Sequence, residues 1–466
     1  MRGVAVELVD AVFERYMRPP ERLTVSKHAE KYRMVAGKDS PYPGPWDNAR
    51  SPWLVDPMDA WNEQGVTDIV IMASTQSGKT TVMENCLYYT IDQDPRPSLY
   101  ITSDAAAAKE FNDDRLIPNL EASERFARHV PVGDRRKLKR NKVTFPTMNL
   151  NLIGATSASQ LARISVQRGF FDEIDKWAQV VRGRGKTEGS AEQLAEARFD
   201  AVPADEQKRV WVSTPTDEGV GIHARYTKSD QAHWEVPCPH CGKYQELRFR
   251  WERGARGGVR WEGGLGEGLE GSEFAAFVQR VRESAWYECE HCGGRIESGD
   301  KKWMNERGVY VRVGQTVRPI DTHDTRDKKP AKGEVVGDPP QTRVRGFAFN
   351  QLVVTWIPFG EVARGFVEER GVPERGWVNR VLGQAWKQPG QGTDAARMAE
   401  ITVSAPGEEA YGRGTVPPEV SGMIGFIDIQ SDHAWWSVRG YGAREQSWLI
   451  DYGRVECPEV VSDRTV

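Results

Sequence analysis

The chain has 466 residues, of which 39% are hydrophobic and 28% are charged, and its formal net charge at pH 7 is −4. This length predicts about three domains. The slightly acidic balance argues against a protein that binds nucleic acid over its whole surface, so any contact with DNA must come from local basic patches. No apolar run reaches the length of a membrane span, and the N-terminus lacks a signal-peptide core, which predicts a cytoplasmic protein with no membrane partner.

The first 45 residues predict a helical lead-in, with helices near 4–16 and 26–32. The stretch Ser40 to Trp46 that follows is rich in proline and breaks regular structure. It would bring an aromatic side chain close to a nucleotide base if the next motif binds a nucleotide.

A strand over 66–72 runs into a loop that ends in Gly78-Lys79-Thr80 and opens a helix over 80–92. The N–H groups of such a loop face an anion, the lysine reaches the β- and γ-phosphates, and the threonine hydroxyl holds Mg²⁺. The common pattern has glycine where Ala73 stands, and the alternative is a plain strand-turn-helix connection with a surface lysine. We assign nucleotide binding to Gln76, Ser77, Gly78, Lys79, Thr80 and Thr81.

Strands and helices alternate along the next part of the chain. A strand over 97–102 precedes a helix over 105–111 with Asp104 as its N-cap. Further strands are expected over 150–155, at Phe170-Phe171 and over 210–213. Such alternation predicts an α/β fold with a parallel sheet that binds its ligand at the C-terminal ends of the strands.

A strand that ends in acidic residues, Gly169 to Asp175, supplies the carboxylates that a P-loop ATPase needs. Asp172 would hold the metal through water, and Glu173 would orient the attacking water. Asp-Glu pairs usually lie on solvated turns, so this interpretation depends on Lys79. Arg163 and Arg168 are candidates for sensing the γ-phosphate or for contacting DNA.

Two further segments between and after these strands remain open to more than one interpretation. The strand over 208–213 ends in a Ser213-Thr214-Pro215 turn, and such a strand end often couples hydrolysis to movement in nucleic-acid motors, although a plain strand terminus is as good a reading. The basic run Arg135 to Lys142 either follows phosphates or forms a solvated surface.

Four of the six cysteines form two C-x-x-C pairs, each followed by glycine. Two such knuckles make a closed tetrahedral Zn²⁺ site, which we assign to Cys238, Cys241, Cys289 and Cys292. A redox pair or a disulfide framework is the alternative. His240 and His291 lie inside the knuckles and are poor ligands once four thiolates are present. We expect a zinc-ribbon insertion over 233–310.

The rest of the chain predicts a connecting subdomain over 311–387, a linker over 388–418 rich in glycine, proline and polar residues, and three strands within 419–466. Asp428 falls in the middle of the first of these strands, between isoleucines. A buried carboxylate there would have to face a group that needs its charge.

In this order, the motifs resemble the large terminase subunit of tailed bacteriophages, in the lambda-like branch called GpA. The resemblance covers nearly the whole chain. It rests on Gln76 to Thr80, Phe171 to Asp175, Ser213 to Thr216, Cys238 to Gly242, Asn379 to Trp386, Gly425 to Gln430 and Trp448 to Tyr452.

The resemblance implies an ATP-driven motor that pumps phage DNA into a procapsid, and a nuclease that cuts the genome into units. The implied fold is a P-loop, RecA/ASCE-like ATPase domain over 46–232 with the zinc-ribbon insertion, followed by the start of an RNase H-like domain. Carried over by motif, Lys79, Asp172 and Glu173 are the catalytic residues. Thr80 and Asp172 hold Mg²⁺ with ATP, Ser213 and Thr214 belong to the coupling motif, and Asp428 is the first ligand of nuclease Mg²⁺ or Mn²⁺ ions.

The implied partners are double-stranded DNA, the small terminase subunit, the portal protein and further copies of the chain in a ring, all in the bacterial host cytoplasm. We expect the nuclease to be incomplete, because the sequence stops after the opening strands and neither Asp432 nor Asp451 is expected to complete the site. The alternatives are a host helicase or translocase, and a zinc-stabilised DNA-binding scaffold with an inactive nucleotide site.

Overall fold

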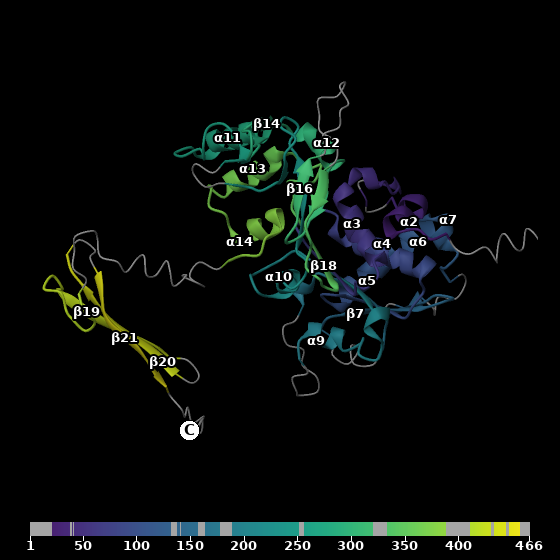
Figure 1. Cartoon of the computed structure of the whole chain (residues 1–466), viewed down its shortest axis with the longest axis horizontal. Helices are drawn as coiled ribbons and strands as arrows, with labels where there is room; N and C mark the ends of the chain where they lie inside the picture. Colours follow the sequence, from purple (N-terminus) through teal and green to yellow (C-terminus); the bar gives the residue numbers. More distant parts are fainter. Residues whose placement is uncertain are drawn as a thin grey trace, which may run out of the picture. The chain divides into compact units, whose positions relative to one another are not determined.

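A computed structural model gives the arrangement of the chain (Figure 1). It describes residues 21–37, 40, 42–131, 138–139, 141–156, 164–177, 189–250, 256–319, 333–387, 411–429, 433–443 and 447–456. The chain divides into two units, Met1–Lys387 and Gln388–Val466, which we call the N-terminal and the C-terminal unit. Within the described ranges, the helices are all too short or too polar to cross a bilayer.

One large mixed sheet organises the N-terminal unit. Its strands are β3 (Asp68–Ala73), β4 (Ser98–Thr102), β5 (Leu138–Lys139), β6 (Lys142–Thr144), β7 (Asn149–Gly154), β8 (Arg168–Asp172), β9 (Lys208–Ser213), β10 (Ala232–Pro237), β11 (Tyr244–Glu246), β15 (Val309–Val311) and β18 (Val344–Phe349). Their order is β11-β10-β18-β3-β9-β8-β4-β7-β6-β5, and β15 pairs with β10. In this order, the strands from β10 through β7 run parallel to one another, which confirms the expected α/β class.

The central strands are buried on both faces of the sheet, which explains why they are nearly continuous apolar runs. Alternate side chains of β3 enter two different cores, with Ile69 and Ile71 in one and Val70 and Met72 in the other. The first core includes α4 (Lys79–Gln93), and the second includes α9 (Ala191–Glu196) and α10 (Gly221–Tyr226). Helices therefore cover both faces of the sheet.

A group of short helices packs around α4 (Figure 1). It contains α2 (Val25–Tyr32), α3 (Val55–Asp59), α6 (Ile117–Ala122) and α7 (Glu124–Ala127), with the 3₁₀ turns η1 (Asn48–Arg50), η2 (Pro52–Leu54) and η3 (Ala60–Asn62) between them in the chain. The predicted helix near 26–32 is therefore α2. The predicted helix near 4–16 and most of the basic run Arg135 to Lys142 lie outside the described residues.

The helix predicted over 105–111 is α5 (Ala105–Glu110), and the chain continues directly into the π-helix η4 (Phe111–Leu116). Asp104 caps it as expected, because its Oδ1 accepts hydrogen bonds from the N–H groups of Ala106 and Ala107 at 2.8 and 3.0 Å.

The remaining elements of the N-terminal unit lie beside or between the main strands. They are β1 (Met34–Val35), β2 (Gly44–Pro45), η6 (Ile174–Lys176), η7 (Ala204–Glu206), β12 (Gly258–Arg260), α11 (Gly271–Ser284), β13 (Trp286–Glu288), β14 (Arg295–Ile296), η8 (Ser298–Asp300), α12 (Lys301–Asn305), β16 (Thr316–Pro319), β17 (Gly333–Val336), α13 (Phe359–Glu368), α14 (Arg375–Trp377) and the π-helix η9 (Val378–Leu382).

The range 311–387 differs from the connecting subdomain that we predicted. Its strand β18 pairs in parallel with β3 over the whole length of both strands and also with β10, so it is a central strand of the main sheet. The sequence hides this pairing because the partner β3 lies far away in the chain. Since β10, β11 and β15 also join the sheet, the cysteine-bearing segment is continuous with it.

The C-terminal unit contains the three expected strands as an antiparallel meander, β19 (Gly422–Ile429), β20 (His433–Tyr441) and β21 (Ser447–Glu456). Asp428 is the second-to-last residue of β19 and pairs in register with Trp435. Its side chain is exposed, so the cost of burying an unpaired carboxylate, from which we argued that it needs a partner, does not apply. Among the described residues of this unit, the three strands form the only sheet, and the alternation of side chains along a strand cannot reveal whether another layer covers it.

A buried aspartate joins the helices around α4. Asp92 accepts hydrogen bonds from His28, His129 and Arg125 at 3.0, 2.9 and 2.8 Å, and its side chain is inaccessible to solvent. Burial by itself would raise the pKa of Asp92, but the hydrogen bonds, those of His129 and His28 foremost, outweigh it and hold the pKa below the ordinary value.

We expect Asp92→Asn to lower the free energy of unfolding by about 3–5 kcal/mol, because it removes the charge that a buried ion-pair network needs. A depressed folded-state pKa contributes stability above the unfolded-state pKa of about 3.9 and loses it as the pH falls through the folded value. Urea titrations of both proteins should therefore show a constant gap near neutral pH that narrows only below about pH 4. A gap that already closes between pH 7 and 5 would contradict this role.

Candidate nucleotide site and metal centre

Three neighbouring strands end at the candidate nucleotide site. In the parallel ladder, Met72 of β3 pairs with Ser213 of β9, and Val212 of β9 pairs with Asp172 of β8. Because parallel strands have their C-terminal ends at the same edge of the sheet, the start of the glycine-lysine loop, the serine-threonine turn and the acidic pair lie together there. The strand order thus brings together the three motifs that the sequence analysis singled out.

The loop between β3 and α4, residues 74–78, is called the phosphate loop below. Gln76 and Gly78 have positive φ values of 59° and 89°. The Ser77 hydroxyl donates to the Ser74 carbonyl at 2.7 Å, and Lys79 Nζ reaches the same carbonyl at 3.3 Å. Residues in the left-handed conformation, alternating with residues in the ordinary right-handed one, direct consecutive backbone N–H groups into the concave side of a loop. Such a loop can bind an anion. Such backbone strain at a non-glycine residue is typical of functional sites.

Glycine is required at Gly78 and not at Ala73. A Cβ on Gly78 would lie 2.7 Å from Leu54 Cδ1, and the positive φ disfavours any side chain there. Ala73 is the last residue of β3, is fully buried and is absent from the positions with positive φ. The departure of this loop from the common glycine pattern therefore has no structural cost.

Residues that the sequence analysis missed hold the phosphate loop in place. The buried Trp53 donates its indole N–H to the Ser77 carbonyl at 3.0 Å, and Gln351 donates to the Thr75 carbonyl at 3.1 Å. The Arg380 carbonyl accepts the Thr75 N–H at 2.8 Å. These partners are distant in the chain, and no local pattern could have indicated them.

Asp172 has the properties of a metal-binding carboxylate. It is buried, and its Oδ1 has no hydrogen-bond partner among the described residues. Burial raises the pKa of Asp172 to about 7, the negative charge of Glu173 adds to this, and the positive charge of Lys79 opposes it. Burial likewise lowers the pKa of Lys79, against the charges of Asp172 and Glu173. A cation beside the unpartnered oxygen would favour the charged carboxylate, so the residues fit a divalent metal.

Glu173 is strained and held by an ion pair. Its φ is 53°, and its Oε2 lies 2.9 Å from Lys176 Nζ, on the turn η6 that follows. The side chain is 39% exposed, so the pair is weak and the carboxylate is free to leave it when another group competes.

The serine-threonine turn contacts the loop after Glu173. The Ser213 hydroxyl accepts the Asp175 N–H at 3.2 Å and donates to the Thr214 carbonyl at 3.1 Å. Ser213 therefore lies where a change at the acidic pair would reach it.

Arg168 does not belong to the nucleotide site, which contradicts the first of the two roles that we considered for it, sensing the γ-phosphate, and leaves the second, contacting DNA, a prediction. It begins β8, at the opposite end of the strand from Asp172, and its Nη2 pairs with Asp94 at 2.5 Å. It also donates to the Glu206 carbonyl at 2.5 Å, so its guanidinium makes contacts at the N-terminal end of β8, away from the phosphate loop. The strand direction decides this, since only the C-terminal end meets the phosphate loop. Arg163 lies outside the described residues.

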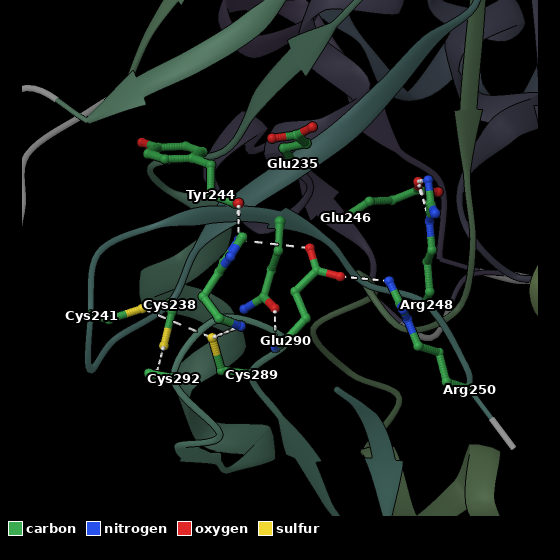
Figure 2. A network of polar contacts seen from close by, with 12 residues as sticks. Glu235, Cys238, Cys241, Tyr244, Glu246, Arg248, Arg250, Cys289, Glu290 and Cys292 are labelled. Atoms are coloured by element: carbon green, nitrogen blue, oxygen red, sulfur yellow. Dashed lines mark hydrogen bonds and ion pairs between the residues drawn. The ribbon is translucent and has the colours of Figure 1, made fainter. Parts of the chain in front are cut away.

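The four cysteines of the two knuckles gather at one point beside β11 (Figure 2). The Sγ atoms of Cys238 and Cys292 are 3.9 Å apart, as are those of Cys241 and Cys289, and all four lie within 4.8 Å of one another. Four sulfurs around one Zn²⁺ at the usual bond length are roughly 3.8 Å apart. The arrangement therefore fits a closed four-thiolate site.

Backbone groups support these sulfurs. The N–H groups of His240 and His291 point at the sulfurs of Cys238 and Cys289, both at 3.4 Å. The two imidazoles bond elsewhere, His240 to the Arg295 carbonyl at 2.6 Å and His291 to the Tyr244 carbonyl at 2.9 Å. Beside the site, Glu290 pairs with Arg250 at 2.5 Å (Figure 2).

Within the described ranges, the cysteines are the one cluster of three or more potential metal ligands. In the same described ranges, Asp428 does not lie in a cluster with two other potential metal ligands. Asp451 lies on β21 and pairs with Arg413 at 2.5 Å. The described strands thus do not assemble a carboxylate site around Asp428.

Comparison with known protein families decides what kind of protein carries these sites. The model of the phage terminase large subunit gpA ATPase domain matches residues 40–310, and that of the gpA endonuclease domain matches residues 344–463. The chain belongs to the phage terminase large subunit gpA family. The endonuclease match begins with β18, a strand of the main sheet, so this family boundary does not coincide with the boundary between the two units.

Curated relatives match along most of the chain. The terminase large subunits of Enterobacteria phage P21 and of Escherichia phage lambda are each 22% identical to it over 442 residues, which are 93% of this chain. The aligned region covers 62% of each relative's length.

Proposed function

We propose that this chain hydrolyses ATP to move double-stranded DNA into a phage procapsid. The proposal rests on one observation. Lys79 and the buried Asp172, which fits a metal ligand, lie close enough at the C-terminal ends of the strands that the charge of each affects the pKa of the other. The family match and the terminase names of the relatives support packaging as the use of this hydrolysis.

In the proposed site, the phosphate loop surrounds the triphosphate. Gln76, Ser77, Gly78, Lys79, Thr80 and Thr81 are proposed to bind its oxygens, and Lys79 to neutralise the charge that develops on the transferred phosphoryl group. Thr80 and Asp172 would hold Mg²⁺, which neutralises phosphate charge when bound. The base would lie near Tyr42, whose ring stacks on the Arg50 guanidinium at 3.9 Å.

Glu173 is proposed to orient the attacking water and accept its proton. In that role it must leave Lys176 and turn toward the γ-phosphate, and its exposed, weak ion pair makes this inexpensive. Ser213 and Thr214 are proposed to couple hydrolysis to DNA movement. A RecA/ASCE-like core is supported by β9, which lies between the strand of the phosphate loop and the strand of the acidic pair.

The other parts of the chain complete the proposal. Cys238, Cys241, Cys289 and Cys292 are proposed to bind a structural Zn²⁺. The C-terminal unit is proposed to be RNase H-like and to use Asp428 for a nuclease Mg²⁺ or Mn²⁺, on the basis of the endonuclease match. The proposed partners are a small terminase subunit, a portal protein and further copies of the chain, in the host cytoplasm.

ATP turnover with and without linear double-stranded DNA tests the proposal. We expect DNA to stimulate turnover, and Lys79→Ala to lower it roughly 10²- to 10³-fold by removing an electrostatic group from the reaction. Lys228→Ala, at an exposed lysine after α10, is the matched control and should keep full turnover. Turnover that survives in Lys79→Ala, or its absence in the wild type, would favour a zinc-stabilised scaffold, and strand separation of duplex DNA would favour a helicase.

A further inference from the structure

Asp175 ties the loop after Glu173 to the turn after β9. Its Oδ1 accepts hydrogen bonds from the N–H and the hydroxyl of Thr216, both at 3.0 Å, and its Oδ2 accepts the Ile222 N–H at 2.9 Å. A Cβ on Gly221 would lie 2.7 Å from the carboxylate, so the fit is tight. Hydrogen bonds to a carboxylate are strong, and a displacement of the Glu173 loop therefore carries Thr216 with it.

The Thr216 carbonyl continues the connection to the end of the N-terminal unit. It accepts the Trp386 N–H at 2.7 Å and one amide hydrogen of Asn379 at 2.8 Å. The amide of Asn379, which is buried, also donates to the Gln384 carbonyl at 2.7 Å. Trp386 in turn accepts the Glu218 N–H at 3.1 Å.

The same segment, residues 375–387, also contacts the phosphate loop. The Arg380 carbonyl accepts both the N–H and the hydroxyl of Thr75, at 2.8 and 3.0 Å. Gly383 has a φ of 61°, and a Cβ there would lie 2.5 Å from the Ser74 nitrogen. The segment is therefore packed between the phosphate loop and the turn after β9.

The 375–387 segment is followed directly by the C-terminal unit, which begins at Gln388. We propose that Asn379 is a positioning residue that transmits the occupancy of the nucleotide site, through Asp175 and Thr216, to the chain that leads into the C-terminal unit. Contiguous hydrogen-bond networks of this kind can carry coupling between distant sites. The inference rests on the proposed ATPase function.

Hydrogen exchange of the amides of residues 384–387, with and without the analogue adenylyl imidodiphosphate, tests this proposal. The Trp386 amide donates to Thr216 and so reports on the connection directly. In the wild type, the analogue should change the exchange rate by roughly fivefold or more. In Asn379→Asp, a carboxylate faces the carbonyls of Thr216 and Gln384 and cannot donate, so the analogue should bind and leave the exchange rate unchanged. DNA stimulation of ATP turnover should be lost while basal turnover remains.

Asn305→Asp is the matched control. Asn305 is also buried and also donates to two carbonyls, those of Lys301 and Val353 at 2.9 and 2.7 Å, but outside this connection. It should keep the wild-type response to the analogue. If Asn379→Asp does not fold, Thr216→Val, which removes only the hydroxyl bond to Asp175, should show a reduced response.

Three results would overturn the proposal. The first is a folded Asn379→Asp protein, or a Thr216→Val protein where that variant replaces it, whose response to the analogue equals that of the wild type. The second is a wild type that hydrolyses ATP but shows no change in hydrogen exchange at residues 384–387. Neither of these results contradicts the proposed ATPase function. A wild type that neither binds the analogue nor hydrolyses ATP contradicts the proposed function and, with it, this inference.

Discussion

Glu173→Gln should lower ATP turnover by roughly 10²- to 10⁴-fold and leave the affinity for ATP unchanged. The amide keeps the size of the side chain but cannot accept a proton from the attacking water. Binding should persist, because the phosphate loop and Lys79 supply the contacts with the phosphates. Loss of the ion pair with Lys176 should matter little to stability, since the Lys176 side chain is 64% exposed and that of Glu173 is 39% exposed.

Single-turnover hydrolysis and titration with a fluorescent ATP analogue measure the two halves of this prediction. Glu124→Gln makes the same chemical change at a side chain that is 96% exposed, and it should match the wild type in both assays. A Glu173→Gln protein that binds ATP much more weakly would show that this residue acts in binding instead.

Cys289→Ser should remove the bound zinc and unfold the cysteine-bearing segment more than the rest of the N-terminal unit. Structural zinc in small sites contributes an apparent binding free energy of about 10–16 kcal/mol at neutral pH, and the site loses most of it with one thiolate. The damage should be greatest around β12, β13 and β14, which form a separate small sheet, and least at β3 and β8 in the main sheet.

Zinc content by atomic absorption and regional hydrogen exchange measure this outcome, and treatment with a chelator should reproduce it. Cys86→Ser is the matched control, because Cys86 is a buried thiol on α4 outside the cluster. Zinc content that stays unchanged in Cys289→Ser would rule out the four-thiolate site.

Local patterns in the sequence were sufficient for the elements that carry the chemistry. The apolar run before Gly78-Lys79-Thr80 predicted β3, the phosphate loop and α4 within one or two residues of their observed bounds. Spacing alone likewise paired the two cysteine knuckles, because a C-x-x-C turn with a following glycine leaves few other uses for its thiols.

Patterns failed where the partner of a residue lies far along the chain. Arg168 was a candidate for sensing the γ-phosphate or for contacting DNA because it lies just before the acidic pair, yet the structure places Arg168 and Asp172 at opposite ends of β8. Asp428 looked buried because its neighbours are isoleucines, but burial depends on whether another layer covers the strand.

Residue type and spacing in the sequence set which groups at each motif can bind phosphate, metal or water. The fold brings the motifs together. It inserted β18 beside β3, placed Gly383 against Ser74, and joined Asp175 through Thr216 to Asn379. These contacts depend on strand order and close backbone approach between segments up to hundreds of residues apart, and no local periodicity encodes either.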